Sequence, residues 1–168
     1  MKKYLLLLTV IFFVTCSYGQ KGFGFDVGIA SSKAPMLDVK YFFNKNAASI
    51  GVSYQIFNDA LGKKNDLIPG TYAIGDGNYF FSVDIGYTRI VSKNFSVSGE
   101  VSIGQKSYYQ NLSDNDFSAG GYHRITSKTS KVGVGGIVTY NINAMVGVFA
   151  GYNSLRQAAV GVELRFVH

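Results

Sequence analysis

The side chains of this 168-residue chain best suited to acid–base catalysis are two histidines, His123 and His168. A histidine that serves as a general base needs a neighbouring nucleophile and an acid that orients the ring. His123 is followed by Arg124 and Ile125, and Ser127 comes two places too late for a His-x-Ser element. We therefore predict that the chain is not an enzyme, and we interpret His123 as a solvated loop residue.

A short acidic segment is the best candidate for a metal site. Residues 114–118 (Asp-Asn-Asp-Phe-Ser) place oxygen ligands at alternate positions, as calcium loops do. Such loops also need a glycine at the sixth position and an acid at the twelfth, where this chain has Ala119 and Ile125. We therefore predict no metal site and no cofactor. Cys16 is the only cysteine, so no disulfide is expected.

Charged residues that alternate with apolar ones form a third group. A period of two places them on one face of β-strands, and buried charges have to be paired. We interpret the group as a structural ion-pair network, with Asp26 and Lys40 as one pair, and a narrow ion path is the alternative. The candidate interior charges are Asp26, Asp38, Lys40, Asp84, Glu100, Lys131, Glu163 and Arg165.

The elements that position these residues are strands, because alternation of apolar with small or polar residues returns eight times after residue 20. In the first segment, Phe23, Phe25 and Val27 fall on one face, and Gly24 and Asp26 on the other. The other predicted strands cover about 37–43, 50–56, 81–88, 97–103, 131–140, 146–152 and 160–166.

Tight turns and longer connections alternate between the predicted strands. Asn-rich turns are expected at 44–46, 92–94 and 141–143, and longer loops at about 58–78 and 105–130. Aromatic residues gather near both ends of the strands, as in the girdles of membrane interfaces. An even strand number with this rhythm predicts an all-β, eight-stranded antiparallel up-and-down transmembrane β-barrel.

The longest of these connections, 105–130, combines aromatic and basic side chains. Such residues can bind the sugars and phosphates of lipopolysaccharide, or another protein. The alternative is that the loop folds back and packs its own aromatics over the barrel mouth. The candidate loop contacts are Tyr108, Tyr109, Phe117, Tyr122 and Arg124.

The N-terminus reads as a secretory leader. Lys2 and Lys3 precede an apolar run over 4–14, which is shorter than the roughly 17–25 residues of a spanning helix. Small residues then predict cleavage before Gln20, and lipidation of Cys16 is the competing interpretation. The predicted organisation is a signal peptide at 1–19 and an outer-membrane barrel domain at 20–168.

Composition decides which face of the strands points outward. Charged residues make up 15% of the chain, against about 25% in soluble domains. The interior of an eight-stranded barrel only just holds side chains, so small polar residues fit inside and the apolar face is expected outside. A soluble, lipocalin-like carrier would have the opposite arrangement. The net charge of +6 comes without a cluster of basic and aromatic residues, so we expect no nucleic-acid binding.

The leader, the alternation, the turn rhythm and the last strand over 160–166 together resemble the small eight-stranded outer-membrane barrels of Gram-negative bacteria, the OmpA/OmpX-type family. The resemblance implies a place in the cell outer membrane, contact with its lipid and lipopolysaccharide, and recognition of the terminal aromatic strand by the barrel-insertion machinery. Here Val167 and His168 follow Phe166, so the aromatic is not the last residue.

These observations favour a non-enzymatic barrel with an envelope-structural role or a surface-interaction role towards a protein or glycan through its loops. The first alternative is a narrow porin-like channel for small solutes or ions. The second is an enzyme acting on envelope lipids through His123.

Overall fold

A computed structural model describes residues 21–63, 68–114 and 120–167. The predicted signal peptide and Cys16 lie outside these ranges, as does Phe117. No helix in the described ranges is long and apolar enough to cross a membrane.

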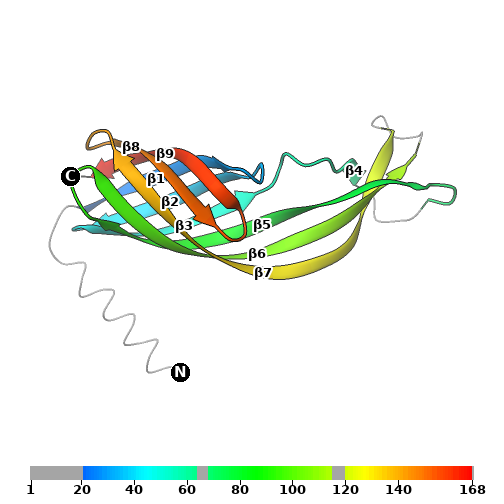
Figure 1. Ribbon diagram of the computed structural model, residues 1–168, viewed down its shortest axis with the longest axis horizontal. Coiled ribbons are helices and arrows are strands. Elements are labelled where there is room, and N and C mark those ends of the chain that lie inside the picture. Colours follow the sequence, from blue (N-terminus) through cyan, green and yellow to red (C-terminus); the bar gives the residue numbers. More distant parts are fainter. Residues whose placement is uncertain (1–20, 64–67, 115–119, 168) are drawn as a thin grey trace, which may run out of the picture.

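Antiparallel pairing between sequence neighbours joins the long strands, and β9 pairs with β1 (Figure 1). Pairing of β7 with β8 completes the ring. This ring confirms the predicted eight-stranded antiparallel up-and-down barrel. The strands are β1 (Lys21–Ala30), β2 (Pro35–Phe43), β3 (Asn46–Tyr54), β4 (Gly62–Lys63), β5 (Ala73–Ile90), β6 (Phe95–Ser113), β7 (Gly121–Asn141), β8 (Val146–Asn153) and β9 (Gln157–Val167).

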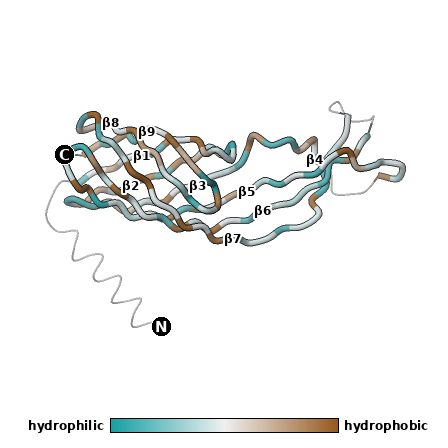
Figure 2. The backbone as a smooth tube through the Cα atoms, in the orientation of Figure 1, coloured by the Kyte–Doolittle hydropathy of each residue, from teal (hydrophilic) through white to brown (hydrophobic). Residues whose placement is uncertain are grey.

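The apolar face of the barrel strands points outward, as predicted. Val27 on β1, Ile85 on β5 and Val138 on β7 are each more than half exposed, whereas Asp26 and Thr139 beside them are fully buried. In Figure 2, hydrophobic and hydrophilic residues alternate along the strands of the barrel. An exterior of this kind suits a hydrocarbon surrounding, and a closed ring leaves no main-chain edge unpaired within it.

The tight turns share one end of the barrel with both ends of the described chain, since Lys21 lies opposite Phe43, and Gly22 opposite Val167. The β2–β3 turn contains Asn44 in a left-handed conformation (φ 55°), which asparagine tolerates better than most residues. Tilted aromatic pairs surround this end, for example Phe95 and Tyr140 with ring centroids 5.3 Å apart.

The opposite end differs from the sequence prediction. Most of the expected loop at about 105–130 and the last part of the loop at about 58–78 are strand, because β5, β6 and β7 extend past the ring as a three-stranded sheet (Figure 1). Pairing continues out to Ala73 opposite Leu112 and Gly121 opposite Ser113. Serine, threonine, lysine and tyrosine fill this part, so apolar alternation is missing although the main chain pairs. We call this region the projecting sheet: residues 73–80, 105–113 and 121–134.

Candidate functional site

Neighbouring strands place interior carboxylates in one row. Asp26 of β1 lies directly opposite Glu163 of β9 on one side and Asp38 of β2 on the other. Gly51 of β3 then separates Asp38 from Asp84 of β5. All four acids are almost completely buried, so this row needs cations from elsewhere in the lumen.

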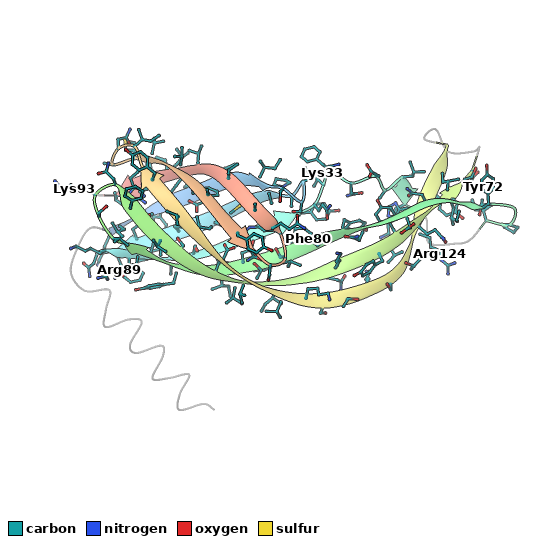
Figure 3. All side chains as sticks on the ribbon, in the orientation of Figure 1. Lys33, Tyr72, Phe80, Arg89, Lys93 and Arg124 are labelled. Atoms are coloured by element: carbon teal, nitrogen blue, oxygen red, sulfur yellow. The ribbon has the colours of Figure 1, made fainter. Side chains whose placement is uncertain are left out.

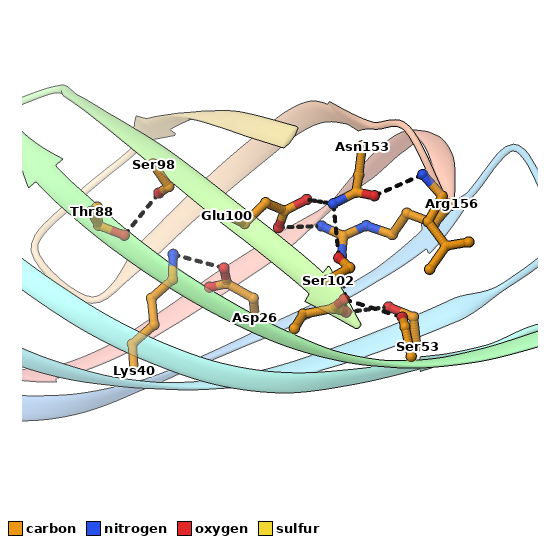
Figure 4. A network of polar contacts seen from close by, with 12 residues as sticks. Asp26, Lys40, Ser53, Thr88, Ser98, Glu100, Ser102, Asn153 and Arg156 are labelled. Carbon is orange, nitrogen blue, oxygen red and sulfur yellow. Dashed lines mark hydrogen bonds and ion pairs between the residues drawn. The ribbon is translucent and has the colours of Figure 1, made fainter. Parts of the chain in front are cut away.

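Lys40 supplies the first of these cations. Its Nζ lies 2.7 Å from Asp26 Oδ2, the pair that the sequence suggested (Figure 4). Lys40 also donates to Glu163. Arg165 binds the other oxygen of Glu163, and its Nη2 donates to Ser96 Oγ at 3.1 Å. Two carboxylates and two cations thus form one neutral group in the half of the lumen nearer the tight turns.

Arg156 supplies the second centre, although sequence reasoning missed it. Its side chain enters the lumen from the turn between β8 and β9, where Nη1 lies 3.0 Å from Asp84 Oδ2 and Nη2 2.6 Å from Glu100 Oε2 (Figure 4). Asn153 Nδ2 donates to the other oxygen of Glu100 at 2.8 Å, and Ser53 Oγ to Asp84 at 2.7 Å. Arg156 is 1% exposed, so its side chain is part of the interior.

Lys131 does not belong to this interior, contrary to the prediction. It shares the inward parity of β7, but pairing of β7 with β8 ends at Gly135 and Asn153. Lys131 lies beyond that point, on the projecting sheet, and is exposed. Without Lys131, the predicted interior set holds five acids and two cations. This excess of acids was the one indication in the sequence that a further interior cation, such as Arg156, was missing from the set.

Glycines make room for the long interior side chains. A Cβ at Gly51 would lie 1.5 Å from Asp38 Oδ1, and a Cβ at Gly135 would lie 2.7 Å from Glu100 Oε1. Above the charges, towards the projecting sheet, Met36, Phe80 and Phe149 belong to an apolar cluster against which the side chain of Leu155 packs. Charged network and apolar cluster together fill the lumen, as expected for a barrel of this size.

The projecting sheet buries several of the predicted contact residues. Consecutive residues of a strand face opposite sides, and both Tyr122 and His123 are buried. Residues 55–63 and 68–72 contact them: the Leu61 carbonyl contacts His123 Nδ1, and Ile68 N donates to the Tyr122 hydroxyl at 3.0 Å. His123 is therefore not solvated, contrary to expectation.

Tyr109 is also buried, at 3% exposure, with its ring 5.5 Å from that of His123. Burial raises the pKa of the Tyr109 phenol and that of Tyr79 beside it. Tyr109 and Tyr122 are thus internal packing residues rather than exposed contacts, because residues such as Leu61 and Ile68 lie against this part of the sheet. Tyr108 is half-buried and Arg124 is exposed.

One edge of β7 is open over most of the projecting sheet. The last contact with the neighbouring hairpin joins Val134 to Ser154, whose N donates to the Val134 carbonyl at 3.0 Å. Beyond it, β4 pairs only with Tyr122 and His123. Among the described residues, no strand pairs with this side of β7 from Arg124 to Gly133, and Thr126 to Val132 are all exposed.

Eight antiparallel strands, an apolar exterior and a filled polar lumen define the chain as a small transmembrane-type β-barrel. The resemblance to OmpA/OmpX-type barrels drawn from the sequence is confirmed at the level of fold by this ring. No family model and no curated protein matches the sequence.

Solved structures do match. Neisserial surface protein A is 14% identical, with a TM-score of 0.48 and coverage of 88% of this chain and 95% of that one. Ail, the attachment invasion locus protein of Yersinia pestis, in complex with the heparin analogue sucrose octasulfate, is 13% identical (TM-score 0.45, 88% and 93% covered). The N-terminal β-barrel domain of Pseudomonas aeruginosa OprF is 11% identical (TM-score 0.44, 88% and 97% covered).

Proposed function

We propose that this chain is a non-enzymatic outer-membrane barrel that binds an extended strand of another protein along the open edge of β7. The signal peptide at 1–19 would direct export, and the apolar exterior would hold the barrel in lipid. The observation that carries the proposal is the edge between Arg124 and Gly133, with which no described strand pairs. Exposed strand edges offer main-chain donors and acceptors to a further strand.

The main-chain groups on this edge can be assigned from its last contact. Val134 directs both its N–H and its carbonyl towards Ser154. Successive residues of a strand point these groups to opposite sides, so Val132, Ser130 and Lys128 direct theirs to the open edge. Thr126, where the pairing with β6 shifts register, ends the regular run.

Side chains beside the edge indicate the chemistry of the partner strand. Lys128 and Lys131 are exposed and lie among serines and threonines, without any carboxylate between Arg124 and Gly133. Lysines on an edge discourage pairing with an arbitrary strand, and they favour one with acidic residues at matching positions. We infer a partner strand rich in acidic and hydroxyl residues.

The test uses the folded barrel in phosphatidylcholine nanodiscs and an acetylated (Glu-Thr)₄ peptide as the probe. NMR would follow hydrogen exchange of backbone amides on β7. We expect the peptide to slow exchange at Lys128, Ser130 and Val132, whose amides face the edge. Unchanged exchange at these three amides with saturating peptide would overturn strand addition.

Matched variants separate main-chain pairing from charge attraction. Ser130→Pro removes one edge amide, and proline is tolerated on an edge strand when its nitrogen faces solvent. We expect it to weaken peptide binding about tenfold, whereas Ser130→Ala retains the amide and should bind normally. A (Lys-Thr)₄ peptide should not bind. Equal binding to Ser130→Pro and Ser130→Ala would contradict the main-chain mechanism.

Location has its own test. The outer-membrane fraction is run on SDS gels with and without boiling, since intact barrels migrate differently from the unfolded chain. A heat-dependent shift, with a mature N-terminus at Gln20 by mass spectrometry, is the expected result. Recovery of the protein in the soluble periplasm would contradict the proposed location.

A further inference from the structure

A cavity of about 730 Å³ opens at the tight-turn end of the barrel, opposite the projecting sheet. Its walls are the turns after β2, β5 and β7, and Phe42 and Arg165 line it from the barrel strands. The cavity lies on the turn side of the neutral group formed by Lys40, Asp26, Glu163 and Arg165. Its volume is in the range of sites that hold small molecules.

The charge in this cavity has one sign. Lys45, Lys93 and Arg165 contribute to the lining, and no carboxylate is among the described lining residues. Arg165 is balanced by Glu163, but neither Lys45 nor Lys93 forms an ion pair with any described residue.

No described carboxylate at this end balances the two lysines. Further cations, Lys21 and Arg89, are exposed there, and Figure 3 shows Arg89 and Lys93 far from Arg124. The described acids lie elsewhere: five are in the lumen, and the others are on or next to the projecting sheet, at Asp59, Asp76 and Asp114. The end therefore carries a positive potential that attracts anions.

Apolar side chains share the cavity with these cations. Ile90, Val91 and Ile142 line it, and Val91 and Ile142 are 66% and 59% exposed. A bound apolar group would remove part of this surface from water, which is favourable. The lining thus combines a cationic part with an apolar part.

The cavity mouth is held in shape by contacts between its turns. Asn141 N donates to the Asn94 carbonyl at 2.7 Å, and Asn141 Nδ2 donates to the Lys93 carbonyl at 3.3 Å. These bonds tie the β5–β6 turn to the end of β7, so the main chain at Lys93 is fixed before any ligand arrives. When the shape of a site exists before binding, less binding free energy is lost to ordering its side chains and loops.

We propose that this cavity binds a small amphiphilic anion. Lys45 and Lys93 bind its phosphate or carboxylate group at the mouth, Arg165 faces it from the floor, and Ile90, Val91 and Ile142 pack against its apolar portion. A phospholipid headgroup region and a soluble organic phosphate share this chemistry.

The test measures binding of 1-naphthyl phosphate to the folded barrel in phosphatidylcholine nanodiscs by isothermal titration calorimetry, with empty nanodiscs subtracted. We expect saturable binding at one site, and weaker binding of uncharged 1-naphthol. The double variant Lys45→Gln/Lys93→Gln should lower affinity by about tenfold or more, because two charged hydrogen-bond donors are lost. An unchanged gel shift on heating would show that this variant folds.

The matched control is Lys33→Gln/Lys106→Gln, which removes the same charge at the opposite end and should leave affinity unchanged. Equal losses in both double variants, or equal binding of 1-naphthol, would overturn the proposal. Two competitors identify the source of the anion. Displacement by phosphatidylglycerol in the disc indicates a lipid headgroup, and displacement by inorganic phosphate alone indicates a soluble ligand.

Discussion

Arg156 and Glu100 are joined at 2.6 Å between Nη2 and Oε2, across the lumen from a turn to the middle of a strand. The same guanidinium contacts Asp84 at 3.0 Å, so one side chain balances two carboxylates of different strands. Removal of one partner from a buried pair leaves uncompensated charge, which costs more than the pair itself contributes.

Arg156→Ala should therefore destabilise the folded barrel by about 3–5 kcal/mol. The measurement is urea unfolding in lipid vesicles, followed by the heat-dependent gel shift. Arg124→Ala is the control, because Arg124 is exposed on the projecting sheet and its removal should change stability little. A stability equal to that of the parent would mean that Arg156 is not buried in the lumen.

Gly51→Ala should cost about 1–3 kcal/mol, because the added Cβ would lie 1.5 Å from Asp38 Oδ1 in an interior without spare volume. Gly99→Ala is a matched control on a neighbouring part of the barrel, since a Cβ there meets nothing within 4 Å. Adding Asp38→Ala should relieve part of the Gly51→Ala defect, since the Leu37 carbonyl oxygen, 2.7 Å from the added Cβ, remains. Failure of this rescue would contradict the packing of Asp38 over Gly51.

Val148→Arg should weaken folding into lipid by about 2–4 kcal/mol if the residue lies near the bilayer midplane. Val148 is 42% exposed on the apolar exterior. Ser127→Arg places the same charge on the exposed part of the projecting sheet and should be tolerated. Ser82→Arg would act differently, through steric overfilling of the lumen, since Ser82 is 1% exposed. Equal tolerance of arginine at 148 and 127 would contradict the membrane-facing assignment.

A planar-bilayer recording should show no discrete conductance steps from the intact barrel, because charged residues and the apolar cluster fill the lumen. Steps that change size in Lys40→Ala or Glu100→Ala would instead support the narrow-channel alternative. The recording should use protein whose gel shift confirms folding, so that silence does not reflect unfolded material.

The barrel strands were predictable because one face of each strand meets an apolar exterior and the other a polar lumen. This difference gives the sequence a strict period of two. The register was not, since it follows from barrel shear, and the row of Glu163, Asp26 and Asp38 became visible only with the strand pairs. The projecting sheet escaped prediction for a related reason. Its strands are rich in serine, threonine and lysine, so main-chain pairing leaves little apolar pattern to read.

Interior charges were predictable where alternation continued within the ring, as for Asp84 and Glu100. The prediction failed for Lys131. Alternation along a strand says which way a side chain points, but not whether a neighbouring strand still covers it. Arg156 lies in a turn, where alternation gives no direction at all. Only the excess of interior acids pointed to a missing cation.

The position of Arg156 in the last hairpin also bears on assembly. Asp84 and Glu100 belong to β5 and β6, yet their cation arrives only when β8 and β9 complete the ring. Glu163, which binds both Lys40 and Arg165, likewise arrives only with β9. Pairing of Asp84, Glu100 and Glu163 with their cations thus depends on the last two strands, and a chain that lacked its final hairpin would have to keep Asp84 and Glu100 hydrated. The charge network therefore couples the burial of these acids to the arrival of the last hairpin.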